Sequence, residues 1–199
     1  MSGSSRPPHR ARVQTYRNVL GDIGAHRGRF EALVKSGGKT IFNPDRKRLQ
    51  LKLCAEDEVV QSILRCLNGR GLLRGRLVGD AYVLHSKRGC RAQQLHTDYE
   101  ASAVRALRRK PLSVLVALQD GTSLTLKTER VLLNAGDMCT FEGDVMHAGS
   151  AYDSHNTRLF MYIPTPLMPA PVDTTYLEVT ASPPKKPIHP TLLPKNSLP

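Results

Sequence analysis

The sequence contains no tryptophan and few aromatic residues, which make up 5% of its 199 residues. It also lacks an uninterrupted run of about 18 apolar residues, which a membrane-spanning helix requires. It contains neither a Gly-rich phosphate-binding loop nor an internal repeat. These absences argue against a membrane span, a P-loop nucleotide site and a repeat architecture. They also leave few rings for stacking on nucleic-acid bases.

Paired cysteines are missing as well. The four cysteines lie singly at wide spacings, without the Cys-x-x-Cys pairs of structural zinc sites. We therefore expect reduced and mostly buried thiols at Cys54, Cys66, Cys90 and Cys139. The N-terminus has no apolar stretch typical of a secretory signal, so we expect an intracellular protein. The cytoplasm is our first choice, with an organelle or the nucleus as alternatives.

Both ends of the chain differ in composition from the middle. Residues 1–18 carry four arginines and no acid, which predicts a flexible basic arm. Residues 165–199 are rich in proline, which favours an extended C-terminal tail. Residues 19–164 then form a single domain with its own core.

The domain is basic. The whole chain has 29 Lys and Arg against 17 Asp and Glu, a net charge of +12. A positive rim would attract an anionic small-molecule or protein substrate, or nucleic acid, and a solvated basic surface is the alternative interpretation. Part of the charge lies in a basic cluster made of Lys87, Arg88, Arg91, Arg105, Arg108, Arg109 and Lys110.

Hydrophobic periodicity predicts two helices followed by many short strands. The helices are expected over 22–36 and 56–67, with the second ending at Asn68-Gly69. This order predicts a mainly β fold with flanking helices, a sandwich or jelly roll. The strands are expected over 81–86, 112–118, 122–126, 130–133, 138–141 and 157–163.

Three side chains form a candidate metal site. His96 and Asp98 are two residues apart, so on an extended segment both project from the same face. A third ligand must come from a neighbouring strand, and His147 is our choice. Two histidines and one carboxylate suit iron(II), because they leave positions open on the metal. Arg158 follows His147 by 11 residues and could bind a dicarboxylate through its planar fork.

These residues resemble a known family between Tyr82 and Ile163. The segment from Gly89 through His96-Thr-Asp98 is similar to that of phytanoyl-CoA-hydroxylase-like proteins. The segments Gly136-Asp-Met-Cys-Thr-Phe141 and Val145-Met-His147-Ala-Gly149 resemble the family's distal-histidine strand pair. The chain therefore resembles the 2-oxoglutarate- and iron(II)-dependent dioxygenases, in particular the phytanoyl-CoA-hydroxylase-like and prolyl-hydroxylase-like branches. It departs from the Arg-x-Ser variant, because Phe160 stands where the serine would follow Arg158.

The resemblance implies a double-stranded β-helix (jelly roll, cupin-like) core and a hydroxylase reaction. Iron(II) would be held by His96, Asp98 and His147, and Arg158 would anchor the cosubstrate 2-oxoglutarate, with release of succinate and carbon dioxide. Ascorbate would serve as a reductant. We also expect Ser86 and Gln94 to contact the cosubstrate or to orient a ligand.

Other interpretations stay open. His155 competes with His147 as third ligand, although it lies in a polar turn, Asp153-Ser-His-Asn156. His26, His85 and His189 are read as structural histidines. Asp98 could be a simple turn carboxylate, and Arg158 could pair with a surface acid. At the level of function, the alternatives are a catalytically degenerate cupin-like binding protein and a nucleic-acid-modifying oxygenase.

Overall fold

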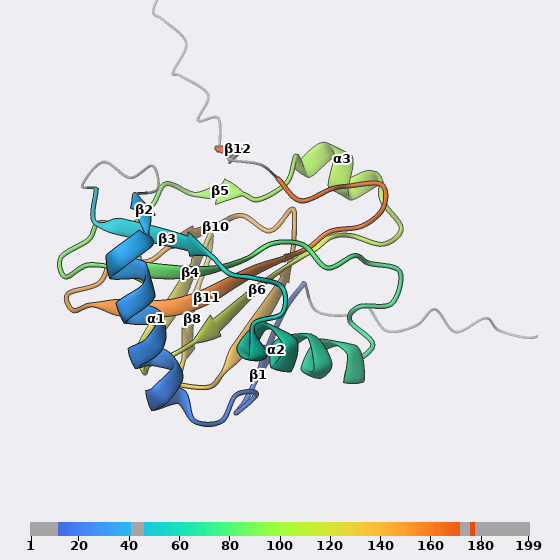
Figure 1. Ribbon diagram of the computed structural model, residues 1–199. Coiled ribbons are helices and arrows are strands. Elements are labelled where there is room, and N and C mark those ends of the chain that lie inside the picture. Colours follow the sequence, from blue (N-terminus) through green and yellow to red (C-terminus); the bar gives the residue numbers. More distant parts are fainter. Residues whose placement is uncertain (1–11, 41–45, 172–175, 178–199) are drawn as a thin grey trace, which may run out of the picture.

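The computed structural model describes residues 12–40, 46–171 and 176–177, which form mainly antiparallel strands arranged in two sheets (Figure 1). The larger sheet consists, in spatial order, of β1 (Val13–Tyr16), β9 (Met138–Glu142), β6 (Leu112–Ala117), β11 (Asn156–Ile163), β4 (Ala81–Ser86), β3 (Arg48–Lys52) and β2 (Lys39–Thr40). The smaller sheet consists of β12 (Tyr176–Leu177), β5 (His96–Thr97), β10 (His147–Gly149), β7 (Thr122–Leu126) and β8 (Arg130–Leu133).

The two faces of the larger sheet bury different sets of side chains. On β11, Leu159, Met161 and Ile163 belong to the core beneath the helices. Phe160 instead packs in a second core with residues of β6, β9 and the smaller sheet. Because side chains alternate along a strand, Arg158 and Tyr162 share the face of Phe160, which lies between the sheets. The predicted jelly-roll core with flanking helices is confirmed.

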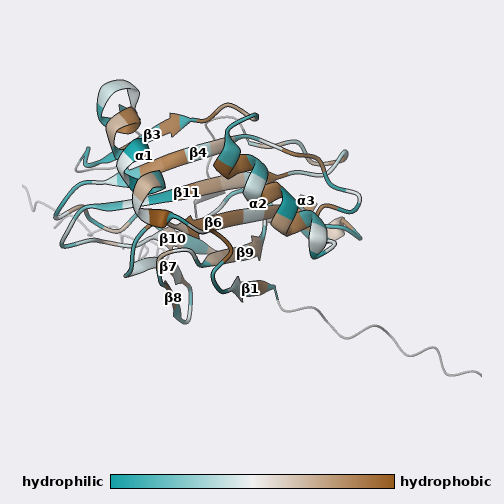
Figure 2. Ribbon diagram, turned by 60° about the horizontal axis from the view of Figure 1, so that its bottom comes forward, coloured by the Kyte–Doolittle hydropathy of each residue, from teal (hydrophilic) through white to brown (hydrophobic). Residues whose placement is uncertain are grey.

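Two helices cover the outer face of the larger sheet, α1 (Ile23–Gly37) and α2 (Glu58–Gly69). Asp57 caps α2 by accepting a hydrogen bond from the Val59 amide at 3.0 Å. The helix buries Val59, Val60, Ile63 and Leu67, and Figure 2 shows brown, hydrophobic colour along much of β4 and β6 beneath the helices. Both predicted helices are present. The second continues through Gly69, and Gly71 (φ 68°) takes the left-handed conformation expected at the end.

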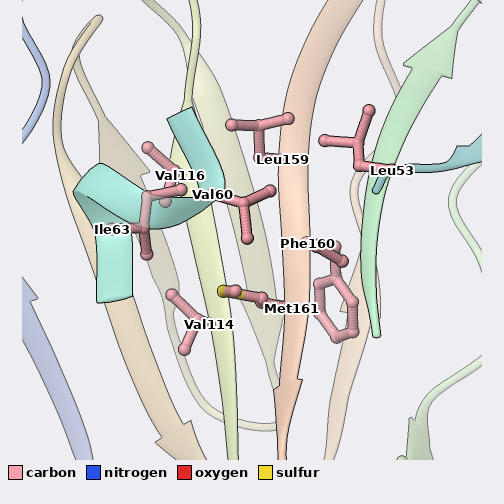
Figure 3. A pocket seen from close by; sticks show the side chains of 9 residues that line it. Leu53, Val60, Ile63, Val114, Val116, Leu159, Phe160 and Met161 are labelled. Carbon is pink, nitrogen blue, oxygen red and sulfur yellow. The ribbon is translucent and has the colours of Figure 1, made fainter. Parts of the chain in front are cut away.

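A small apolar cavity of about 10 Å³ lies between α2 and the larger sheet (Figure 3). That volume holds roughly one water molecule, and an apolar lining gives a water no partners. The cavity is part of the packing beneath α2. Its lining residues are Leu53, Val60, Ile63, Ala81, Val114, Val116, Leu159, Phe160 and Met161.

The structure differs from the expected domain boundaries at both ends. Residues 1–11 and 178–199 lie outside the described residues. Val13–Tyr16 forms the edge strand β1 rather than part of a flexible arm. The arginines on either side of it form ion pairs: Arg12 with Asp144 at 2.5 Å, and Arg17 with Asp137. In the expected tail, Tyr176–Leu177 forms β12 beside β5.

Further elements come from segments that gave no signal in the sequence. They are β2, β3 and the short helix α3 (Ala101–Ala106), which the Glu100 side chain caps. In the part of the chain that the structure describes, no helix has the length and apolar character to span a membrane. The four cysteines are free thiols; Cys90 and Cys139 are buried, Cys66 is half-buried and Cys54 is exposed.

Candidate metal centre

His96, Asp98 and His147 lie together between the two sheets. One ligand atom from each residue lies within 4.8 Å of the other two. His147 Nε2 is 3.6 Å from Asp98 Oδ1, and the two imidazole rings have centroids 4.5 Å apart. All three residues are buried, with exposed fractions of 3–7%. The structure thus brings together the three side chains that the sequence analysis named as candidate metal ligands.

Strand pairing brings the two histidines together from positions 51 residues apart in the chain. His96 on β5 and His147 on β10 are direct partners in the antiparallel register. Gly136, which needs its positive φ of 86°, turns the chain into the strand β9 that precedes β10. His147 therefore faces His96 because the distal segment returns as the neighbouring strand.

Backbone carbonyls fix the orientation of both rings. His96 Nδ1 donates to the Gln94 carbonyl at 2.8 Å, and His147 Nδ1 donates to the Val145 carbonyl at 3.0 Å. A carbonyl only accepts, so each Nδ1 carries a hydrogen, and in the neutral tautomer that this selects, Nε2 is the nitrogen with the free lone pair. Metal-binding histidines are commonly held in this way. The donor set thus fits a divalent metal with imidazole and carboxylate preference.

Asp98 is oriented by a hydroxyl. Ser113 on β6 donates a hydrogen bond to Asp98 Oδ2, while Oδ1 faces His147. Ser113 is completely buried. A carboxylate held through one oxygen presents the other in a fixed direction, so Ser113 sets the direction of the third ligand.

The environment of His96 favours the neutral form of its ring. Burial lowers the pKa of His96 below its usual 6.5, and the neighbouring His147 lowers it further. A neutral imidazole is the form that binds metal. Next to Asp98, burial of Tyr99 raises the pKa of its phenol, and the Asp98 carboxylate acts in the same direction. Tyr99 therefore stays protonated.

Arg158 is buried between the sheets, with an exposed fraction of 3%. Its Nη1 donates to Ser86 Oγ at 3.0 Å and to Asn156 Oδ1 at 3.3 Å, both uncharged acceptors. Among the residues that the structure describes, Arg158 forms no ion pair with an acid, and its guanidinium lies 5.3 Å from the Tyr152 ring centroid. A buried guanidinium held by neutral groups suits a site for an anion.

The register places Arg158 at a distance from the metal ligands. Arg158 pairs with Ala117, whereas Tyr162 pairs with Ser113, whose hydroxyl contacts Asp98. Four residues along a strand span about 13 Å. An arginine side chain and a five-carbon dicarboxylate together can bridge that separation.

Of the two remaining predicted site residues, the Ser86 side chain lies in the candidate site and the Gln94 side chain does not. Ser86 lies beside the Arg158 guanidinium and is completely buried. Gln94 is exposed, and it orients His96 through its backbone carbonyl. Sequence reasoning missed Arg48 on β3, which is buried and also donates to Ser86 Oγ, at 3.1 Å. Arg48 lies in the run Arg46-Lys47-Arg48, which looks like a solvated basic segment.

The competing histidines lie elsewhere. His155 is exposed and stacks on His85 with centroids 5.5 Å apart, away from the metal cluster. His85 Nδ1 is 2.8 Å from Thr157 Oγ1. Both fit a structural role, and His189 lies outside the described residues.

The basic cluster of the sequence is divided in space. Lys87, Arg88 and Arg91 follow the end of β4 at Ser86, which pairs with Asn156. The segment 105–110 precedes Leu112, which pairs with Ile163 at the opposite end of β11. The two halves therefore lie toward opposite ends of the sheet, and only the second lies toward the Asp98 side.

Comparisons with known proteins agree with this fold. No family model matches the chain, and no curated protein sequence matches it. Among solved structures, the viral collagen prolyl hydroxylase of Paramecium bursaria Chlorella virus-1, in complex with 2-oxoglutarate, is similar over 77% of this chain and 96% of that chain, with 16% identity and a TM-score of 0.59.

Two bacterial structures are similar in the same way. HygX from Streptomyces hygroscopicus, with nickel and 2-oxoglutarate bound, matches over 80% of this chain and 85% of its own, with 11% identity and a TM-score of 0.62. A Pseudomonas putida prolyl-4-hydroxylase matches over 77% and 92%, with 14% identity and a TM-score of 0.59. The chain therefore has the double-stranded β-helix fold of the 2-oxoglutarate- and iron-dependent oxygenases, as the resemblance predicted.

Proposed function

We propose that the protein is an iron(II)- and 2-oxoglutarate-dependent dioxygenase that hydroxylates its substrate. The observation that carries the proposal is the convergence of His96, Asp98 and His147, each with a ligand atom oriented by the surrounding structure. Two histidines and a carboxylate on one face of a metal leave the opposite face for a cosubstrate and dioxygen. Similar folds that bind nickel and 2-oxoglutarate support the same assignment.

In this proposal the chain's own residues have distinct tasks. His96 and His147 bind iron(II) through Nε2, and Asp98 binds it through Oδ1. Arg158 holds the distal carboxylate of 2-oxoglutarate, and Ser86 assists it. Iron(II) held there, together with 2-oxoglutarate and dioxygen, would supply the oxidising chemistry, with succinate and carbon dioxide as products. Ascorbate keeps the metal reduced.

We further propose that the substrate is anionic, either a small molecule or a segment of a protein. The support is an exposed basic surface made of Arg74, Arg105, Arg108 and Arg109. Two loops form it: Arg109 donates to the Arg74 carbonyl, and Arg76 Nε donates to the Lys110 carbonyl at 2.8 Å. A positive surface at this end of the sheet raises the local concentration of anions.

The test is succinate production in air with iron(II), ascorbate and 2-oxoglutarate. Candidate substrates are supplied in pairs that differ only in a phosphate or carboxylate group. The wild-type protein should form more succinate with the anionic member of a productive pair, and His96→Ala and Asp98→Ala should form none above the metal-free background. Arg108→Glu should raise KM for the anionic substrate alone, whereas Arg65→Glu on exposed α2 should not.

Three results would each contradict part of the proposal. Absence of succinate despite bound iron would favour the degenerate binding protein instead. Equal turnover of charged and neutral substrates would reject the anionic substrate while leaving the oxygenase in place. Turnover of single-stranded nucleic acid alone would favour the nucleic-acid-modifying alternative.

A further inference from the structure

Arg48 is a buried arginine that connects the candidate metal centre to the candidate cosubstrate anchor. It lies on β3 with an exposed fraction of 1%. In the sheet, β3 pairs with β4, and Arg48 lies directly opposite Ser86. Its side chain extends from the larger sheet to the backbone of the segments around Arg91 and Gly149, which precede and follow the two candidate metal-binding histidines.

One half of the guanidinium holds the backbone next to both histidines. Arg48 Nη2 donates to the Arg91 carbonyl at 2.8 Å, which precedes His96 by five residues. The same nitrogen donates to the carbonyl of Gly149, the last residue of β10, at 3.1 Å and to that of Ser150, the next residue, at 2.7 Å. One planar group thus ties together the segments that flank the two metal-binding histidines.

Gly149 leaves room for this contact because it has no side chain. A Cβ atom at this position would lie 2.4 Å from Gln93 Oε1 and 3.0 Å from Arg48 Nη1. Gln93 Oε1 already accepts a hydrogen bond from the Gly149 amide at 3.0 Å. Any larger residue would push apart the groups that meet here, so the glycine permits the close approach.

The other nitrogen of the guanidinium, Nη1, shares an acceptor with Arg158, the hydroxyl of Ser86. Arg48 Nη1 and Arg158 Nη1 donate to Ser86 Oγ at 3.1 and 3.0 Å. A serine hydroxyl has two acceptor lone pairs and one hydrogen to donate. Two guanidinium donors fill both lone pairs. The Ser86 hydrogen is then left to donate to a further acceptor.

We propose that Arg48 is a positioning residue that makes Ser86 a hydrogen-bond donor to the distal carboxylate of the cosubstrate. This inference rests on the proposed function, because it assigns the anion beside Arg158 to 2-oxoglutarate. Arg48 and Arg158 fix the Ser86 oxygen, and the Ser86 hydroxyl and the remaining Arg158 donors bind the carboxylate.

The test compares two ligands that differ only at the distal end. Calorimetric titration of the nickel-loaded protein measures Kd for 2-oxoglutarate and for 2-oxobutanoate, which lacks the distal carboxylate. Ser86→Ala and Arg48→Met should each weaken 2-oxoglutarate binding about tenfold, the loss expected for one hydrogen bond to a charged group. Binding of 2-oxobutanoate should stay unchanged in Ser86→Ala, and in Arg48→Met it should weaken far less than binding of 2-oxoglutarate, because Arg48 also holds backbone beside the two histidines. Arg48→Lys should recover part of the loss, because it retains a donor and the charge.

A double variant and a control separate positioning from general stability. If Arg48 acts through Ser86, its replacement should weaken binding much less in a Ser86→Ala background than in the wild type. Arg76→Lys is the matched control, because Arg76 also donates to two backbone carbonyls, those of Lys110 and Leu72. It should leave both affinities unchanged.

The outcomes are distinguishable. Equal weakening of both ligands, or additive effects of the two replacements, would overturn the role of Arg48 and leave the oxygenase assignment intact. Failure of the nickel-loaded wild-type protein to bind 2-oxoglutarate would instead contradict the proposed function. Ser86→Ala and Arg48→Lys keep the test decisive if Arg48→Met fails to fold.

Discussion

At the residue scale, the candidate site depends on hydrogen bonds to the ligands as much as on the ligands themselves. Ser113 Oγ donates to Asp98 Oδ2 from a fully buried position on β6. Ser113→Ala should weaken metal binding by about tenfold, the lower end of the effect of removing such a partner. Competition with a fluorescent chelator measures this affinity. Ser36→Ala on α1, an exposed serine, is the control, and equal affinity of both variants would contradict the assigned role of Ser113.

The ligands could be predicted from sequence, but the groups that orient them could not. The motif His96-Thr-Asp98 fixes two ligands because alternation on an extended segment is local. Arg48 and Ser113 carry no such local signal, since their roles arise from the pairing of β3 with β4 and from the position of β6 beneath Asp98. Ser86 was predicted near the cosubstrate, but the second guanidinium on its hydroxyl was not.

At the element scale, an acid far along the chain secures the edge strand β1. Asp137 accepts hydrogen bonds from the Arg17 side chain and from the amides of Asn18 and Asn134, and its exposed fraction is 1%. Asp137→Ala leaves these donors without the carboxylate and should lower the free energy of unfolding by about 2 kcal/mol. Urea denaturation measures the change. Asp153→Ala, in an exposed turn, should have little effect; an equal loss would contradict this role.

The composition of residues 1–18, taken as one segment, concealed this strand. Four arginines without an acid predict an unordered arm when the segment is taken alone. The acids that neutralise Arg12 and Arg17 lie more than 100 residues later, at Asp144 and Asp137. By contrast, β4, β7 and β8 were predicted with the correct bounds, because their own residues carry the strand signal.

The junction of α1, β4 and β11 should respond to pH. Burial lowers the pKa of His85 below 6.5; His155, Lys35 and Arg158 lower it further, and Glu31 opposes them. The folded protein therefore binds this proton more weakly than the unfolded chain, so stability should fall as the pH drops below about 6.5. The free energy of unfolding, measured by urea denaturation at pH 7.5 and 5.5, should fall less in His85→Asn than in the wild type. Identical falls would contradict this.

At the scale of the whole molecule, two sheets place distant segments around one buried centre. The smaller sheet supplies His96 and His147, and the larger sheet supplies Ser113, Ser86 and Arg158. The fold class could be predicted from the succession of short strands in the sequence. The division of the basic cluster could not, because it depends on which ends of β11 its two halves lie beside. Local spacing therefore predicted that His96 and Asp98 lie together, whereas pairing across the sheets brings His147 and the groups around the three residues into place.

The most direct test of the central claim is the stoichiometry of iron(II) binding, measured by anaerobic equilibrium dialysis. The wild-type protein should bind one iron(II) per chain with the three ligands that converge between the sheets. His147→Ala should lose this binding, and His155→Ala, which changes an exposed histidine outside the cluster, should retain it. Retention of iron by His147→Ala, or its loss in His155→Ala, would contradict the assignment.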